Sequence, residues 1–335
     1  MNRKDDHIKG ALDQSVRSND FDQVRFIHDP LGETAYGEVS LNGTMAGHAF
    51  PLPIYINAMT GGASQSETIN RRLAMLAKHY GIPMAVGSMS AAMKDEQWAK
   101  SFTVVRDVFP EGFILANLGA EVDTATARRA VHLINADALQ LHLNPLQELI
   151  MPEGDHDFSH TASNIQAIKD GLDVPIMVKE VGFGIGRETL KKLHAIGIRM
   201  VDVSGTGGTN FATIENRRRD HALDYLEGFG LSTVESLIEA TDFTTTMEIH
   251  ASGGIRNPLD VLKALRLGAS MVGMSRYFLN LVTTYEHEEA IQVFDRFIDG
   301  MKRIMVLLGA KNLAELKEKP MVLSPTLDHY RLQRS

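Results

Sequence analysis

The chain contains no cysteine among its 335 residues. Disulfide bonds, thiolate zinc sites, iron–sulfur clusters and cysteine nucleophiles are therefore excluded. It also lacks an excess of positive charge, because its formal net charge is −8 at pH 7. General nucleic-acid binding requires a basic face, so we expect no nucleic-acid partner.

Long apolar runs are absent as well. A bilayer-spanning helix needs about 20 consecutive apolar residues, and no stretch approaches that length. The first residues, Met1 to His7, are charged and have no apolar segment of the kind found in secretory signals. We therefore expect a cytoplasmic protein with no membrane partner.

Hydrophobic residues make up 44% of the chain, which is enough for one large core. Short apolar, β-branched runs alternate with segments of helical periodicity, a pattern typical of βαβ units and a parallel sheet. The predicted strands lie at 54–57, 84–86, 114–117, 138–143, 176–181, 200–204, 247–251 and 271–273. Eight such units favour an α/β fold of the TIM (β/α)8 barrel type over an open sheet.

Two regions fall outside this alternation. Residues 1–50 are predicted to form an N-terminal extension, a helix plus a β-hairpin turning at Asn42-Gly43, which serves as a lid or plug. The barrel would occupy residues 51–310. Residues 311–335 are polar and are expected to form a loosely packed C-terminal tail.

Glycines follow three of the predicted strands, at 61–62, 205–208 and 253–254. Glycine after a strand indicates a sharp turn or a close backbone approach to a ligand. The last two loops combine free N–H groups, hydroxyls and Arg256, and Ser275-Arg276 follows the eighth strand. Barrels often bind phosphate after strands seven and eight, so these loops together predict a phosphorylated cofactor, although each alone fits an ordinary turn.

Polar residues also follow the fourth strand. His142 and Asn144 fall on one side of an extended segment, and Gln147 and Glu148 lie on the loop after it. One carboxylate there suffices for Mg²⁺ held mostly through water. The alternative is a solvated loop.

Lys179 lies within the apolar fifth strand, where a lysine is costly to bury without a partner. Beside a flavin ring it would stabilise negative charge; otherwise it would extend outward between helices. Ser88 and Asn117, which end strands two and three, suit the edge of a cofactor ring. The run Asn216–Asp220 is interpreted as a solvated or subunit-contact segment.

Several of these motifs, in this order, resemble the type 2 isopentenyl-diphosphate isomerases. The resemblance extends from residue 3 to about residue 285. The motifs that carry it are Arg3–Ile8, Asn57–Gly62, Gln147-Glu148, Val178–Gly184 and Ser252–Arg256. It implies a barrel that binds FMN at its mouth, active with reduced flavin, with NADPH or NADH as reductant and Mg²⁺ as metal. It also implies isomerisation of isopentenyl to dimethylallyl diphosphate in isoprenoid biosynthesis, by a homo-oligomer of four or more subunits.

The resemblance also implies roles for individual residues. Catalysis would fall to Gln147, Lys179 and His142, and Mg²⁺ to Glu148. The substrate would be bound by Arg3, Lys4, His7, Ser88, His142, Asn144 and Gln147. FMN would be surrounded by Met59, Thr60, Gly61, Ser88, Asn117, Lys179, Ser204, Thr209, Gly253, Gly254, Arg256, Ser275 and Arg276.

The chain departs from the family pattern at Ser90. Many members read Gly-Ser-Gln-Arg after strand two, whereas this chain reads Gly87-Ser88-Met89-Ser90. The missing arginine usually meets the diphosphate, so Arg3, Lys4 and Mg²⁺ would carry the positive charge.

Two alternatives remain open at this stage. One is an FMN-dependent oxidoreductase of the hydroxy-acid oxidase type, which usually has a His-Gly-Gly base; here Ser252 precedes the glycines, with His250 close by. An inosinate dehydrogenase would need the cysteine that the chain lacks. The other alternative is a flavin-binding barrel without catalysis, in which Gln147 and Glu148 would have no function.

Overall fold

The computed structural model describes residues 10, 14 and 18–334. Eight parallel strands close into a barrel in chain order, with Val272 of the last strand paired to Ile54 of the first. The strands are β4 (Ile54–Ile56), β5 (Met84–Ala85), β6 (Ile114–Gly119), β7 (Ala138–Leu143), β8 (Ile176–Glu180), β9 (Met200–Asp202), β10 (Glu248–Ser252) and β11 (Met271–Met274). Each overlaps a predicted strand, so the TIM-barrel prediction is confirmed.

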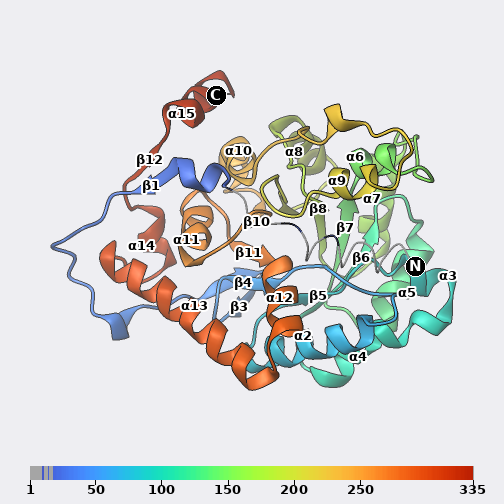
Figure 1. The fold of residues 1–335 in the computed structure, drawn as a ribbon, viewed down its shortest axis with the longest axis horizontal. Helices are drawn as coiled ribbons and strands as arrows, with labels where there is room; N and C mark the ends of the chain where they lie inside the picture. Colours follow the sequence, from blue (N-terminus) through green and yellow to red (C-terminus); the bar gives the residue numbers. More distant parts are fainter. Residues whose placement is uncertain (1–9, 11–13, 15–17, 335) are drawn as a thin grey trace.

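Helices surround the strands (Figure 1). The outer helices are α2 (Ser66–Tyr80), α4 (Lys100–Val108), α5 (Thr124–Leu133), α7 (Thr161–Gly171), α8 (Arg187–Ala195), α10 (Thr233–Glu239), α11 (Pro258–Arg266), α12 (Arg276–Thr284) and α13 (His287–Leu307). Gly81, Gly197 and Gly268, which follow α2, α8 and α11, adopt φ values of 61°, 88° and 112°. These left-handed conformations end the helices as the sequence predicts. None of the helices in the described ranges is long and apolar enough to cross a membrane.

Short helices lie between strands and outer helices, at the carboxyl ends of the barrel strands. They are α3 (Ser90–Lys94), α6 (Pro145–Ile150) and α9 (Phe211–Asn216). Asn210 caps α9 by accepting a hydrogen bond from the Thr213 N–H. These helices carry side chains of the candidate site described below.

The hairpin of the N-terminal extension, β2 (Gly43–Met45) and β3 (His48–Phe50), packs at the amino ends of the strands. Met45 is fully buried in a cluster with Tyr55, Phe113 and Met271, residues near the starts of barrel strands. The hairpin thus acts as a plug. Its turn is at Ala46-Gly47, with φ values of 50° and 80°, so the prediction of a turn at Asn42-Gly43 is wrong. Gly43 instead serves close packing, because a Cβ there would lie 2.5 Å from the Met271 sulfur.

The C-terminal tail is ordered against the barrel, so the expectation of loose packing is wrong. It contains α14 (Leu313–Lys317), β12 (Met321–Leu323) and α15 (Pro325–Arg334). Strand β12 pairs antiparallel with β1 (Val24–Phe26), which joins the two ends of the described chain (Figure 1). Leu316 and Leu327 are buried, and Arg334 donates to Glu239 of α10 at 2.7 Å. The buried residues of the tail are widely spaced in a polar sequence, so no apolar pattern predicts this packing.

Candidate active site at the carboxyl ends of the strands

The loops at the carboxyl ends of the strands enclose a cavity of about 460 Å³. This size suits a small-molecule site. Every predicted site residue in the described part of the chain lines it: Met59, Thr60, Gly61, Ser88, Asn117, His142, Asn144, Gln147, Glu148, Lys179, Ser204, Thr209, Gly253, Gly254, Arg256, Ser275 and Arg276. Arg3, Lys4 and His7 lie outside the described residues. The fold thus brings the candidates together, and the role of each stays a prediction.

One end of the cavity is built from backbone. Gly207, Gly253 and Gly254 have φ values of 106°, 89° and 74°, which favour glycine. Within the described ranges, the N–H groups of Gly208, Gly253 and Gly254 have no hydrogen-bond acceptor. Converging free N–H groups of this kind form an anion-binding concavity. This end of the cavity therefore fits the phosphate of a cofactor such as FMN.

The glycines are also required by packing. A Cβ on Gly253 would lie 2.1 Å from the Gly205 carbonyl oxygen, and one on Gly208 would lie 2.9 Å from the Gly254 nitrogen. Side chains at these positions would push the loops after β9 and β10 apart. The close approach of the two loops is what places their N–H groups together.

A network of buried polar side chains adjoins the cavity through Asn57 and Ser252, which line it. Asp202 of β9 is fully buried and accepts hydrogen bonds from the Tyr55 hydroxyl and the Asn57 amide, each at 2.7 Å. It also accepts from the Ser252 hydroxyl at 2.8 Å. Sequence reasoning missed Asp202, although an acidic residue ending an apolar strand was a usable signal.

Lys179 lies on β8, the strand next to that of Asp202. It is buried, lines the cavity and pairs in register with Asp202, so the alternative in which it extends outward is wrong. Its ammonium group donates to the Glu180 carbonyl oxygen at 2.6 Å. Burial lowers its pKa from the ordinary lysine value, while the charges of Asp202 and Glu180 oppose that shift. The arrangement places the Lys179 side chain in the cavity wall next to two acidic residues.

His142 and Asn117 come from neighbouring strands and meet in the cavity. The Nδ1 atom of His142 lies 2.9 Å from Oδ1 of Asn117, and the Asn117 amide donates to the Val86 carbonyl at 3.3 Å. With that amide committed to Val86, Oδ1 faces the imidazole as an acceptor, which favours the proton on Nδ1. The other ring nitrogen then remains as an acceptor.

Helix α6 presents Gln147 and Glu148. The Gln147 amide donates to Oε1 of Glu215 at 3.1 Å, and Glu215 is fully buried and paired with Arg218 at 2.5 Å. Sequence reasoning missed Glu215. Arg217, Arg218 and Asp220 are exposed, as the interpretation of Asn216–Asp220 as a solvated or subunit-contact segment expects, whereas Asn216 is buried. Arg218 also pairs with Glu153. Glu215 fixes the side chain of Gln147.

Glu148 is the carboxylate predicted to bind metal. Its oxygens accept from the Asn144 amide at 2.7 Å and from the Asp155 N–H at 3.1 Å. Across the part of the chain that the structure describes, no group of three acidic or histidine side chains is placed to hold a metal. The donor set therefore fits Mg²⁺ only with oxygen ligands from water or a phosphate completing the shell.

Two further charged residues line the cavity without having been predicted. Glu121 follows β6, and burial raises its pKa, with the charges of Glu148 and Asp155 adding to the effect. Lys94 ends α3, four residues after Ser90, and both residues line the cavity. Residues four apart on a helix lie on one face, so Lys94 supplies a positive charge near the position where the family arginine is missing.

Comparisons with known proteins agree with this picture. The family model described as FMN-dependent dehydrogenase matches residues 117–323. The isopentenyl-diphosphate delta-isomerase of Latilactobacillus sakei strain 23K is 49% identical over 335 residues, covering 99% of this chain and 96% of the relative. The enzymes of the same name from Staphylococcus saprophyticus and Staphylococcus aureus strain JH9 are 46% and 44% identical at the same coverage.

Solved structures support the fold. The flavin-binding domain of baker's yeast flavocytochrome b2 superposes with a TM-score of 0.74 at 20% identity, covering 97% of this chain and 84% of that one. A mandelate oxidase variant with an FMN adduct gives a TM-score of 0.66 at 18% identity, covering 91% and 89%. Such distant likeness shows the barrel alone. The full-length relatives show the family, and the chain belongs to the FMN-dependent isopentenyl-diphosphate delta-isomerases.

Proposed function

We propose that the protein interconverts isopentenyl and dimethylallyl diphosphate with reduced FMN and Mg²⁺. The observation that carries the proposal is that one cavity is lined by every described residue that the family resemblance assigns to the site. The names and near-complete coverage of the relatives support the same reaction. The proposal extends to NADPH or NADH as reductant, a cytoplasmic location, a homo-oligomer of four or more subunits, and the domain boundaries at residues 50 and 310.

FMN would be held at its phosphate by the loops after β9, β10 and β11, and at its ring by Met59, Thr60, Asn117 and Lys179. When bound in reduced form, the flavin supplies proton-transfer sites for an unactivated alkene, which ordinary side chains are too weakly acidic to protonate at pH 7. Lys179 keeps a positive charge in a desolvated wall, where it is worth more than in water. The negative charge of Asp202 favours the charged form of that lysine.

The substrate diphosphate would lie toward α3 and α6. Lys94 contributes positive charge there, and Glu148 would share Mg²⁺ with the diphosphate, together with the predicted contacts of Arg3, Lys4 and His7. Holding the diphosphate fixes the alkene in position, so binding energy from a group remote from the reaction is used to orient it. Gln147 and His142, whose orientations are set by Glu215 and Asn117, complete the polar wall.

The hydroxy-acid oxidase alternative is less well supported. Such an enzyme needs a histidine base at the cavity, but His250 is fully buried within β10 and is not among the residues that line the cavity. The residue before the glycines, Ser252, instead bonds to Asp202. The match to the family model described as FMN-dependent dehydrogenase and the barrel shape of distant structures favour this alternative, but the full-length relatives are named as isomerases.

The decisive experiment incubates dithionite-reduced holoenzyme with isopentenyl diphosphate and Mg²⁺. We expect dimethylallyl diphosphate to form, FMN to be released on denaturation, and activity to disappear when the flavin is removed. Full activity of a flavin-free preparation would contradict the cofactor role. Oxidation of a 2-hydroxy acid without isomerisation would favour the oxidoreductase alternative, and flavin binding without either reaction would favour a non-catalytic barrel.

Replacing Lys179 with methionine is expected to make bound FMN harder to reduce. The change removes a buried cation and leaves Asp202 and Glu180 uncompensated, so negative charge on the flavin becomes less favourable. We expect the two-electron midpoint potential to fall by about 30 mV or more, the equivalent of about 1.4 kcal/mol. The exposed Lys191→Met variant on α8 is the matched control. An unchanged potential in Lys179→Met would place this lysine away from the ring.

A further inference from the structure

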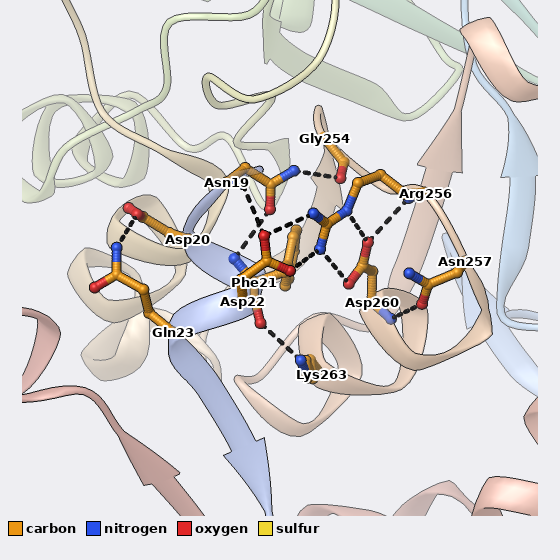
Figure 2. A network of polar contacts seen from close by, with 10 residues as sticks. All are labelled: Asn19, Asp20, Phe21, Asp22, Gln23, Gly254, Arg256, Asn257, Asp260 and Lys263. Atoms are coloured by element: carbon orange, nitrogen blue, oxygen red, sulfur yellow. Dashed lines mark hydrogen bonds and ion pairs between the residues drawn. The ribbon is translucent and has the colours of Figure 1, made fainter. Parts of the chain in front are cut away.

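Arg256 lies at the end of the phosphate turn, yet its guanidinium is already bound by two carboxylates. Its Nε donates to Asp260 at 2.7 Å, and its Nη1 and Nη2 donate to the two oxygens of Asp22 at 2.9 and 2.6 Å. Figure 2 shows the guanidinium between these two carboxylates. The hydrogen bonds that Arg256 donates to Asp22 and Asp260 raise its pKa, so this arginine stays charged.

Asp22 reaches the turn from the N-terminal extension. It belongs to η1 (Asp20–Gln23), a 3-10 helix capped by Asn19, whose side chain accepts from the Phe21 N–H. The helix is anchored to α11, because Phe21 is buried and its carbonyl accepts a hydrogen bond from Lys263 of α11 at 2.7 Å. A segment some 230 positions before the turn is thereby fixed against α11.

Asn19 makes a second contact with the phosphate loops. Its amide donates to the Gly254 carbonyl at 2.8 Å, as Figure 2 shows. It also packs against both loops, since a Cβ on Gly207 would lie 3.0 Å from the Asn19 Cβ and one on Gly254 2.9 Å from its amide nitrogen. The hydrogen bond occupies the carbonyl of Gly254 and leaves its N–H free.

The charges around Arg256 cancel. Asp22 and Asp260 are balanced by Arg256 and Lys263, so this group presents no net positive charge to a phosphate. Arg276, which follows β11 and lines the same cavity, differs: its described partner is the Gln14 carbonyl at 2.9 Å, and none of the ion pairs within the described ranges includes it. Among the described residues, Arg276 is therefore a cavity-lining cation without a carboxylate partner.

We propose that Asn19, Asp22 and Arg256 are positioning residues that hold the turn Ser252–Arg256 in its anion-binding shape. Arg256 acts through the backbone of the turn and is not the counter-ion of the phosphate, a role that falls to Arg276. The inference rests on the proposed binding of FMN. It links the N-terminal extension to the cofactor site through these described residues.

The direction in which one substitution changes the affinity for FMN distinguishes the two possible roles of Arg256, counter-ion or positioning residue. Asp22→Asn removes a negative charge near the phosphate and frees part of the guanidinium. A counter-ion would then bind FMN more tightly, whereas a loosened turn binds it more weakly. We expect the Kd of the full-length apoprotein for FMN to rise about tenfold, or about 1.4 kcal/mol, while the Kd for riboflavin, which has no phosphate, changes less than about twofold.

Three further variants complete the test. Asn19→Ala, which changes no charge, should weaken FMN binding in the same direction and keeps the test available if Asp22→Asn folds poorly. Arg256→Lys should have a smaller effect in the Asp22→Asn background than alone, because the Asp22–Arg256 contact is already lost there and only the contact with Asp260 remains to be changed. Asp299→Asn, which breaks the exposed Arg303–Asp299 pair of 2.5 Å on α13, is the control and should leave both Kd values unchanged.

Tighter FMN binding by Asp22→Asn would overturn the proposal in favour of a counter-ion. Unchanged binding, or an equal loss for FMN and riboflavin, would also overturn it. If the unmodified protein bound no FMN, the proposed function would be contradicted. The positioning role would then be tested separately, by amide hydrogen exchange. Faster exchange of residues 253–256 in Asp22→Asn than in Asp299→Asn would support that role, and equal exchange would refute it.

Discussion

Replacing Glu148 with glutamine is expected to abolish the Mg²⁺ dependence of isomerisation and to lower kcat/KM by roughly 10²–10³-fold. A metal that neutralises a diphosphate contributes several kcal/mol, and about 1.4 kcal/mol corresponds to a factor of ten. Glutamine keeps the size of the side chain and a hydrogen-bond acceptor, so α6 should retain its structure. The loss would come from the missing negative charge of the side chain.

The measurement is a Mg²⁺ titration of initial rates, combined with FMN content. Asp157→Asn is the matched control: Asp157 lies on the same loop region, bonds to Ser159 at 2.9 Å and does not line the cavity. We expect the control to titrate like the unmodified enzyme and both variants to retain FMN. A Glu148→Gln enzyme with an unchanged Mg²⁺ titration would remove Glu148 from the metal site.

The barrel could be predicted from the sequence because its signals are local. Each strand is a short apolar run, and glycines mark the helix ends and the loops after β9 and β10. Parallel strands then bring their carboxyl ends together, so residues as distant as Thr60 and Arg276 fall on one cavity. Topology alone was enough to gather the candidate site.

The partners of these residues could not be predicted in the same way. The Asp22–Arg256 contact joins positions 234 apart, and that of Gln147 with Glu215 joins positions 68 apart. Neither pair has a spacing that a sequence pattern reveals. Arg256 illustrates the consequence: its position beside two glycines suggests direct contact with a phosphate, while the structure surrounds its guanidinium with carboxylates.

The position of the positive charge near the expected diphosphate site also could not be predicted from the sequence. Sequence comparison with the family pattern identified Ser90 as the site of a missing arginine, but Lys94 became a candidate only when α3 was seen to begin at Ser90. Ser90 itself makes a modest contact, with its hydroxyl 3.1 Å from that of Ser88. The diphosphate would thus rely on Lys94, Mg²⁺ and the predicted contacts of Arg3 and Lys4.

Deleting residues 1–8 is expected to raise the KM for isopentenyl diphosphate by about 10²-fold or more while leaving FMN affinity unchanged. The deletion removes Arg3 and Lys4, and a hydrogen bond between charged groups contributes about 1.5–3 kcal/mol. The chain that follows reaches the mouth of the barrel: Gly10 lies beside Ile214, and Gln14 bonds to the Asn210 N–H at 2.9 Å. The first described residues therefore lie beside α9, at the carboxyl ends of the barrel strands.

Adding Ser90→Arg to the truncated protein is expected to recover part of the lost affinity, because it restores a cation at the position where the family usually has one. In the full-length chain the same substitution should change KM little, since Arg3 and Lys4 are then present.

The double substitution Arg3→Ala with Lys4→Ala should reproduce the effect of truncation, and Lys94→Ala should raise KM further in that background. An unchanged KM after truncation would show that the N-terminal residues take no part in binding the diphosphate, and the remaining positive charge at Lys94 and Mg²⁺ would then account for it alone.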